Sequence, residues 1–214
     1  MFQIGLHKEP ADLRALLQER IDAATGEEYD AVVMAYGLCG QATAGLMAGE
    51  IPLVIPRAHD CITLFLGDRR RYNAEFRERP GTYWYALDYM ERSDGEMSLG
   101  VDADERTQDL YQEYVEKYGV DNADYLMEVM GAWRSHYDRA AYIDMNVGDS
   151  TAVEAKTKEV AALRGWTFER LAGDLVLIRR LLAGDWEADF LVLEPGQQVA
   201  MTYDFQVIGC LESE

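Results

Sequence analysis

Two short apolar runs constrain the fold of this chain more than any other feature of its sequence. Residues 30–36 and 51–55 are rich in valine, isoleucine and leucine, with no alternation between apolar and polar positions. Strands of this kind are buried on both faces, as in a parallel sheet that is covered by helices on either side. Gly37 and Pro56 end the two runs, so each strand is followed by a turn.

The rest of the chain alternates between helical and strand-like patterns. Apolar spacing predicts helices over residues 10–21, 44–47, 61–66, 104–118, 121–133, 151–163 and 175–182. Further strands are predicted over residues 1–6, 81–87, 142–145, 166–171, 190–193 and 199–203, although residues 175–178 alone suit a strand equally well. These elements predict an α/β fold: an open, mostly parallel, Rossmann-like sheet with helices on both faces.

Shifts in composition divide the chain into three segments. Residues 1–67 form a first βα lobe, residues 68–140 hold an aromatic strand and a pair of helices, and residues 141–214 return to the βα pattern. The length of 214 residues suits two small lobes or one continuous domain. Either arrangement can bury a core without disulfides or structural metals.

The charge of the chain restricts its partners. Thirty-nine acidic residues against 20 basic ones give a formal net charge of −19, which would repel the phosphates of a nucleic acid. No apolar run approaches the roughly 20 residues that cross a bilayer, and the N-terminus lacks the pattern of a signal peptide. We therefore expect a cytoplasmic protein that binds a small molecule, without nucleic acid or membrane partners, and the oligomeric state stays open.

Cysteine and histidine follow the two buried strands. Cys39 comes just after the first strand, and His59, Asp60 and Cys61 come just after the second. Neighbouring parallel strands lie about 5 Å apart and end at the same edge of the sheet, which is where open α/β sheets bind ligands. Thiolates and imidazole are the donors that zinc and iron prefer, so the spacing predicts a zinc or iron site.

The predicted metal ligands are Cys39, His59 and Cys61, with Cys210 as a fourth. This H-x-C…C spacing resembles the zinc signature of thiol-activating methyltransferases. The alternative is that Cys39 and Cys61 are buried as small apolar residues, that His59 is a hydrogen-bonded loop residue and that Cys210 is a core thiol. A further alternative is a reversible disulfide between Cys39 and Cys61.

Substrate binding is predicted at the same strand ends. Gly37 and Gly40 flank the turn after the first strand, and Arg57 and Asp60 lie in the loop after the second, where Arg57 would orient an anionic group. The arginines at 69–71 are interpreted as a solvated loop. Neither G-x-G-x-x-G nor G-x-x-x-x-G-K-[ST] is present, so the sequence carries no nucleotide-binding fingerprint.

Several segments together resemble the domain-of-unknown-function family 1638. They are YGLCG at 36–40, IPRAHDCITLFLG at 55–67, PGTY at 80–83, and the stretch from GDW at 184–186 through the Pro-Gly turn at 195–196. The resemblance implies a setting in anaerobic archaea and bacteria near corrinoid-dependent methyltransferase systems, with corrinoid-pathway proteins as partners, and no established activity. It also implies that Cys39, His59 and Cys61 belong to the family pattern.

The chain departs from this family at its start. The family begins with a further strand–helix unit that carries a cysteine, whereas Met1 lies close to the segment that would follow that unit. A fourth ligand would then come from Cys210, Asp60, water or a substrate.

Three functions remain open at this point. The first is a metal-binding α/β protein, either an enzyme or an accessory factor, in anaerobic one-carbon and methyl-transfer metabolism. The second is a non-catalytic module that binds a small ligand or a partner. The third is a dithiol redox protein.

Overall fold

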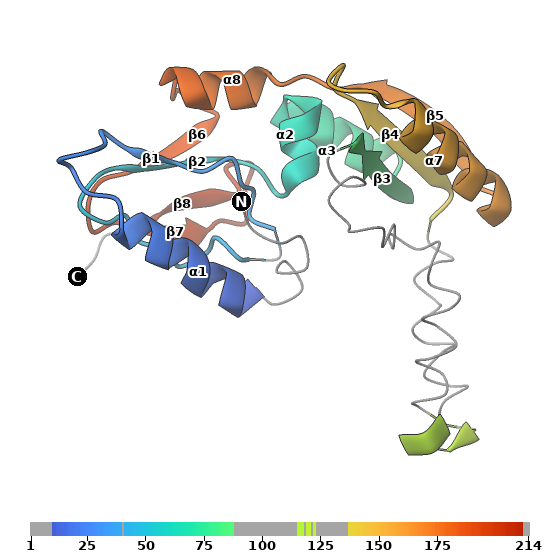
Figure 1. Cartoon of the computed structure of the whole chain (residues 1–214), viewed down its shortest axis with the longest axis horizontal. Helices are drawn as coiled ribbons and strands as arrows, with labels where there is room; N and C mark the ends of the chain where they lie inside the picture. Colours follow the sequence, from blue (N-terminus) through green and yellow to red (C-terminus); the bar gives the residue numbers. More distant parts are fainter. Residues whose placement is uncertain are drawn as a thin grey trace. The chain divides into compact units, whose positions relative to one another are not determined.

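The computed structural model describes residues 10–39, 41–87, 115–117, 119–120, 122 and 137–211. The chain divides into two compact units, one made of Met1–Glu75 with Gly173–Glu214 and the other of Phe76–Ala172 (Figure 1). The first unit therefore joins the whole first predicted segment and residues 68–75 of the second to residues 173–214 of the third. Each unit combines helices with an open three-stranded sheet, which confirms the α/β prediction.

The sheet of the first unit has the order β1-β2-β6. The unit contains α1 (Pro10–Asp22), β1 (Val32–Val33), β2 (Leu53–Pro56), α2 (Cys61–Leu66), α8 (Val176–Ala183), β6 (Phe190–Leu193), β7 (Gln198–Met201) and β8 (Ile208–Leu211). β1 and β2 are parallel neighbours, as the two apolar runs predict, whereas β6 pairs antiparallel with β2. A strand from near the end of the chain thus completes this sheet.

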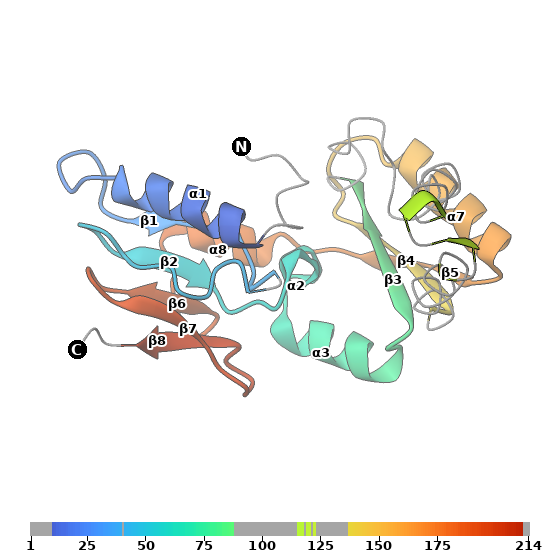
Figure 2. The same ribbon diagram turned by 90° about the horizontal axis from the view of Figure 1, so that it is seen from below.

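The sheet of the first unit is covered on both faces. Leu53 and Ile55 of β2 face a core shared with α1 and with the ribbon of β7 and β8. Val54 faces the opposite core, which holds side chains of α2 and α8. Figure 1 shows α1 and α8 on opposite sides of β2, and Figure 2, seen from below, shows α1 in front of α8. This arrangement explains why β2 is apolar at every position, because strand side chains alternate between the two faces.

The second unit contains a parallel sheet in the order β3-β4-β5. Its elements are β3 (Thr82–Ala86), β4 (Arg139–Asp144), α7 (Thr151–Arg164) and β5 (Thr167–Ala172). The helix α7 connects β4 to β5, as parallel pairing requires, and Val160 of α7 packs on Tyr85 and Tyr142. Arg139 is buried in β4 and binds Thr82 and Glu169.

Most of the predicted elements in the described residues are confirmed. The strands near residues 81–87, 142–145, 166–171, 190–193 and 199–203 and the helices near residues 10–21, 61–66, 151–163 and 175–182 are present. Residues 175–178, which suit either structure, begin the helix α8. The strand predicted over residues 1–6 lies outside the described residues, as do almost all of the helices predicted over residues 104–118 and 121–133. The sequence patterns did not predict β8.

The short helix predicted over residues 44–47 is wrong. Gly45 has a φ of 88°, and its N–H donates to the carbonyl of Val199 at 2.8 Å. Val199 in turn donates to the carbonyl of Leu46 at 2.8 Å, and Met47 bridges to Gln198. A four-residue helix is unfavourable to nucleate, so pairing with β7 satisfies these backbone groups instead.

The arginine run is helical rather than a loop. It begins α3 (Arg69–Glu78), and the carboxylate of Asp68 accepts the N–H of Arg70 at 2.6 Å before the first turn. An aspartate at this position satisfies a backbone donor that a helix start leaves unpaired. Arg69 itself is only 9% exposed, so the expectation of a solvated run fails for this residue.

None of the described helices combines the length and the apolar character that crossing a bilayer would require.

The C-terminus of α2 depends on Gly67. This residue has a φ of 74°, and its N–H donates to the carbonyl of Thr63. A Cβ at Gly67 would lie 2.7 Å from both Cβ and the carbonyl oxygen of Asp174. Left-handed backbone and close packing therefore both require glycine at this position.

We predict that Gly67→Ala destabilises the protein more than Gly184→Ala. Gly184 ends α8 with a similar φ of 78°, but nothing lies within 4 Å of its missing Cβ. Gly184→Ala should cost about 1 kcal/mol for the backbone conformation alone. Gly67→Ala should cost a further 1–3 kcal/mol, roughly the range for overpacking. Urea denaturation followed by fluorescence measures both, and equal costs would contradict the packing explanation.

Candidate functional site

The loops after β1 and β2 run side by side. The N–H of Leu38 donates to the carbonyl of Ala58 at 2.8 Å, and the N–H of Cys39 donates to the carbonyl of His59 at 2.9 Å. These bonds continue the parallel pairing beyond the strands. They bring Cys39 beside the loop that carries His59 and Cys61, as the sequence predicts.

Gly37 allows the two loops to approach this closely. A Cβ on Gly37 would lie 2.7 Å from Cα and 2.8 Å from the nitrogen of Asp60. The carbonyl of Gly37 also accepts the hydroxyl of the buried Thr43 at 3.4 Å. Gly37 therefore positions the loops by close packing, and its predicted role in substrate binding stays a prediction. Gly40 lies outside the described residues.

Cys39 has a strained backbone. Its φ is 42°, in the left-handed region that residues other than glycine seldom adopt, and Gln41 follows with a φ of 72°. Such conformations persist only where surrounding contacts enforce them, and they are concentrated at functional sites. Here, the hydrogen bond to His59 provides such a contact.

The thiol of Cys39 lies at the start of α2. Burial and the charge of Asp60 raise the pKa of this thiol to about 11, although backbone hydrogen bonds from Gly37 and Cys61 lower it. Cys61 is the first residue of α2, and its backbone N–H hydrogen-bonds to the Cys39 thiol. With no cation bound nearby, Cys39 is a protonated thiol at neutral pH.

Asp60 is the N-cap of α2. Its Oδ1 accepts the N–H groups of Ile62 at 3.0 Å and Thr63 at 3.3 Å, and its Oδ2 accepts the hydroxyl of Tyr72 at 3.0 Å. Burial raises the pKa of this carboxyl, while these hydrogen bonds and the charge of His59 oppose the shift. Both carboxylate oxygens are thus already engaged in the fold, and a ligand role for Asp60 would compete with helix capping.

Two tyrosines complete the group. Burial raises the pKa of Tyr36 and of Tyr72, and the charges of Cys39 and Cys61 raise both further. The ring of Tyr72 also stacks on the exposed ring of His59, with centroids 5.8 Å apart and planes at 28°. We call the following residues the thiol cluster: Tyr36, Cys39, His59, Asp60, Cys61 and Tyr72.

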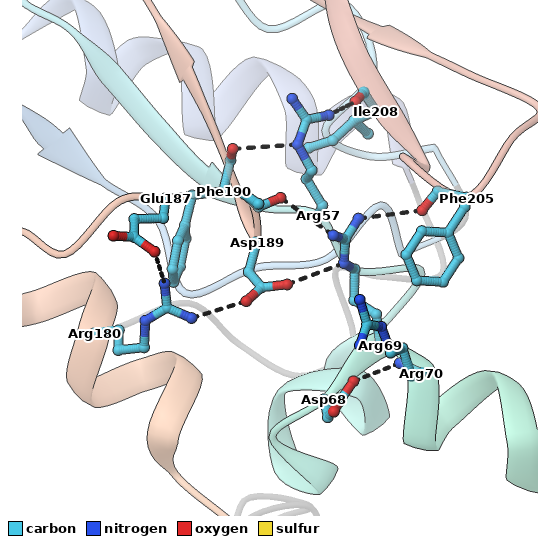
Figure 3. A network of polar contacts seen from close by, with 11 residues as sticks. Arg57, Asp68, Arg69, Arg70, Arg180, Glu187, Asp189, Phe190, Phe205 and Ile208 are labelled. Carbon is cyan, nitrogen blue, oxygen red and sulfur yellow. Dashed lines mark hydrogen bonds and ion pairs between the residues drawn. The ribbon is translucent and has the colours of Figure 1, made fainter.

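Arg57 is directed toward the C-terminal strands. Its Nε donates to the carbonyl of Phe190 at 3.2 Å, and its NH1 donates to the carbonyl of Ile208 (Figure 3). The charges that act on Cys39 do not include Arg57. These contacts give Arg57 a structural role, and substrate binding by Arg57 stays a prediction.

Asp189 joins two further arginines to this region (Figure 3). Its Oδ1 accepts Nε of Arg69 at 3.2 Å, and its Oδ2 accepts NH1 of Arg180 at 2.8 Å. Arg69 also donates to the carbonyls of Phe205 and Ala188, so the fold occupies its donors. This network stabilises the loop before β6 and the turn between β7 and β8.

Cys210 is not a core thiol. It lies on β8 opposite Val199, and its side chain is exposed. Nothing in the described part of the chain links Cys210 to the thiol cluster, so its role as a fourth metal ligand stays a prediction.

Across the described ranges, no three His, Cys, Asp or Glu side chains are arranged to hold a metal ion. Within the thiol cluster, His59 packs on Tyr72 and Asp60 caps α2. The two thiols match the soft donors that zinc and iron accept. A third ligand would require His59 to turn toward the thiols.

Sequence patterns identified the cysteines, His59 and Asp60 but not the tyrosines. Tyr36 precedes the Gly-Leu-Cys-Gly stretch, and its position at the end of the first apolar run was the available signal. Tyr72 lies on α3, a segment whose basic composition indicated a loop rather than a helix.

Comparison with known proteins adds one match. The sequence profile of the family described as "Protein of unknown function (DUF1638)" matches residues 1–182. No curated protein and no solved structure matches the chain.

We predict that alkylation of Cys39 remains slow until strongly alkaline pH. With a pKa of about 11, roughly one thiol in a thousand is ionised at pH 8, and the thiolate is the reactive species. The rate with iodoacetamide should rise about tenfold per pH unit up to pH 10. The measurement uses Cys61→Ala/Cys210→Ala, which leaves only Cys39. Its control is Cys39→Ala/Cys61→Ala, which leaves the exposed Cys210. A rate that levels off below pH 9 would disprove the prediction.

We predict that Asp60→Asn gains stability relative to the wild type as the pH rises. The pKa of Asp60 in the folded protein lies above its ordinary value of 3.8. The protonated carboxyl therefore favours the folded state, and this contribution to stability is complete below pH 3.8. This stability is lost as the pH rises through the folded pKa. Asparagine caps helices about as well and carries no charge to bury. Urea denaturation at pH 4 and pH 7 measures the difference, with Asp174→Asn as the control, because Asp174 is exposed and its Oδ1 accepts the N–H of Val176. A difference that is independent of pH would refute this.

Proposed function

The chain belongs to the DUF1638 family, and we propose that it binds a zinc or iron ion at the thiol cluster through Cys39 and Cys61. His59 is the proposed third ligand, after rotating away from Tyr72. Asp60 is engaged as a helix cap, so the fourth position is left to water or a substrate. The same proposal treats the ends of β1 and β2 as a Rossmann-like ligand-binding edge.

One observation carries this proposal. The backbone bonds between the two loops fix Cys39 against the first residue of α2, which is Cys61. These bonds and the Gly37 contact hold the backbone of Cys39 beside the start of α2, where Cys61 lies. A preorganised pair of soft donors is the part of a metal site that is hardest to assemble by chance.

The charges around the thiol cluster favour a cation over an anion. Burial is the largest cause of the raised pKa values of Cys39 and Tyr72, and the charges that raise them further are acidic, namely Asp60 for both and the two cysteines for Tyr72. Arg57, the basic residue predicted to orient an anion, contacts carbonyl groups of the C-terminal strands. A divalent cation would lower the pKa of both thiols, because metal binding displaces their protons.

An ion held in this way, with one open position, activates a bound thiol or water. In this chain, Asp60 and Tyr72 would hold the second loop in place, and Gly37 would keep the first loop against it. We further propose, from the family resemblance alone, that this activity serves anaerobic methyl-transfer metabolism, in an enzyme or an accessory factor. A small molecule and corrinoid-pathway proteins are its proposed partners.

The two other functions are less well supported. A dithiol exchange protein needs a reactive thiolate, and the raised pKa of Cys39 works against one at neutral pH. A module that binds a ligand without metal would leave the paired thiols without a chemical role. Metal content separates both alternatives from the proposal.

We predict that protein purified without oxygen contains close to one equivalent of zinc or iron. Cys39→Ala and Cys61→Ala should each retain less than about one-tenth of that amount, because each removes one of two anionic ligands. Cys210→Ala is the matched control and should retain the wild-type amount, since Cys210 is exposed on β8. Mass spectrometry of the metals gives the content, and circular dichroism checks folding.

Two results would count against this proposal. One is wild-type protein with only traces of metal that Cys61→Ala leaves unchanged. The other is an equal metal content in all three cysteine variants.

A further inference from the structure

Arg57 is a half-buried cation without a direct counter-ion in the part of the chain that the structure describes. Its Nε donates to the carbonyl of Phe190 at 3.2 Å and its NH1 donates to the carbonyl of Ile208, and both acceptors are neutral. Charged side chains that leave water are normally paired with an opposite charge. The chain has 39 acidic residues, yet none of the described carboxylates forms an ion pair with Arg57.

A second guanidinium adds to the positive charge at this place. Arg69 is only 9% exposed, and its charge reaches Arg57. The carboxylate that pairs with Arg69 is that of Asp189, which also pairs with Arg180. The charge of Asp204 also acts on Arg57, but Asp204 is exposed and accepts hydrogen bonds within its own turn. The positive charge of Arg57 is therefore not balanced by direct contact with an acid.

The guanidinium of Arg57 has hydrogen-bond donors that the fold leaves free. A guanidinium has five N–H groups, and Arg57 uses two of them for carbonyl groups within the described residues, which leaves three. Figure 3 shows one terminal nitrogen of Arg57 pointing away from the groups drawn around it. Free N–H groups in this planar arrangement bind the two oxygens of a carboxylate or phosphate by parallel hydrogen bonds.

The turn that contacts both arginines has a strained backbone. It joins β7 to β8, and its carbonyls of Phe205 and Ile208 accept hydrogen bonds from Arg69 and Arg57. Between them lies Val207, whose φ is 67° although its side chain is β-branched and buried. Such residues seldom adopt left-handed backbone, and strain of this kind is concentrated at binding sites. The contacts that hold the turn also fix the guanidinium of Arg57, so a ligand meets it in one orientation.

We infer that Arg57, with Arg69 beside it, binds the carboxylate or phosphate group of a small anionic molecule. The positive charge attracts the anion, and the free N–H groups of Arg57 donate to its oxygens. Arg69 supplies mainly charge, because its Nε, NH1 and NH2 each donate to a protein oxygen. This anion site goes beyond the proposed function: it uses neither thiol, so it does not depend on a metal ion at the thiol cluster.

Three variants separate the anion site from general electrostatic attraction. Arg57→Gln removes the charge and the planar donors. Arg57→Lys keeps the charge but replaces the planar donors by a single ammonium group. Arg179→Gln removes the same charge from an exposed position on α8 of the same unit and is the matched control. Circular dichroism checks the folding of each variant.

The test is isothermal titration calorimetry of the full-length chain with inorganic phosphate and, separately, with malonate, at constant ionic strength in chloride. The wild type should bind at least one of these anions at a single site, and the tighter one identifies the group that the site prefers. Arg57→Gln should weaken binding about tenfold or more, because hydrogen bonds between charged groups are lost. Arg57→Lys should weaken binding severalfold, and Arg179→Gln should stay within about twofold of the wild type.

The inference would be overturned if neither anion gave more heat than chloride, or if Arg57→Gln and Arg179→Gln lost affinity equally. The variant Cys39→Ala/Cys61→Ala should bind the anion as the wild type does, whether or not the wild type holds a metal ion. Loss of anion binding in this double variant would place the anion at the thiol cluster and overturn the inference. If Arg57→Gln does not fold, Arg57→Lys decides, and unchanged affinity in that variant would overturn it as well.

Discussion

The candidate site depends on the close approach of two backbones, that of Gly37 and that of Asp60. A side chain at Gly37 would meet backbone atoms of Asp60 at 2.7–2.9 Å, so the loops touch without any side chain between them. This contact allows the N–H of Cys39 to reach the carbonyl of His59. It also accompanies the left-handed backbone of Cys39, whose strain the surrounding hydrogen bonds must offset. The arrangement of the thiol cluster therefore depends on the absence of a Cβ at residue 37.

A second constraint comes from the end of the chain. Arg57 and Arg69 bind carbonyl groups, and Asp189 links Arg69 to Arg180, which also pairs with Asp185 and Glu187 (Figure 3). Unlike an exposed ion pair, a network that shares one carboxylate among part-buried partners is sensitive to the loss of any member. The family match ends at residue 182, yet β6 beyond it pairs with β2. The strand that carries the site thus depends on a segment outside the matched region.

Sequence patterns predicted the features that depend on residues close together in the sequence. The apolar runs at β1 and β2, the turn at Gly37 and the glycine end of α2 each follow from a few adjacent residues. The antiparallel pairing of β6 with β2 joins residues more than a hundred positions apart, and no local pattern encodes it. The direction of Arg57 depends on carbonyls brought in by that pairing, which no local pattern encodes. The place of Tyr72 in the thiol cluster was not predicted, because its segment forms a helix after Asp68 where the composition indicated a loop.

The contact between Gly67 and Asp174 has a consequence for how the chain is made. Asp174 donates its N–H to the carbonyl of Phe65 at 2.9 Å, so the segment that returns to the first unit is bound to the C-terminal part of α2. The Phe76–Ala172 unit is an insertion between the two parts of the first unit. During synthesis, β2 emerges from the ribosome long before β6. Until β6 is synthesised, β2 has an unpaired edge, and an unpaired edge can pair with another chain and lead to aggregation.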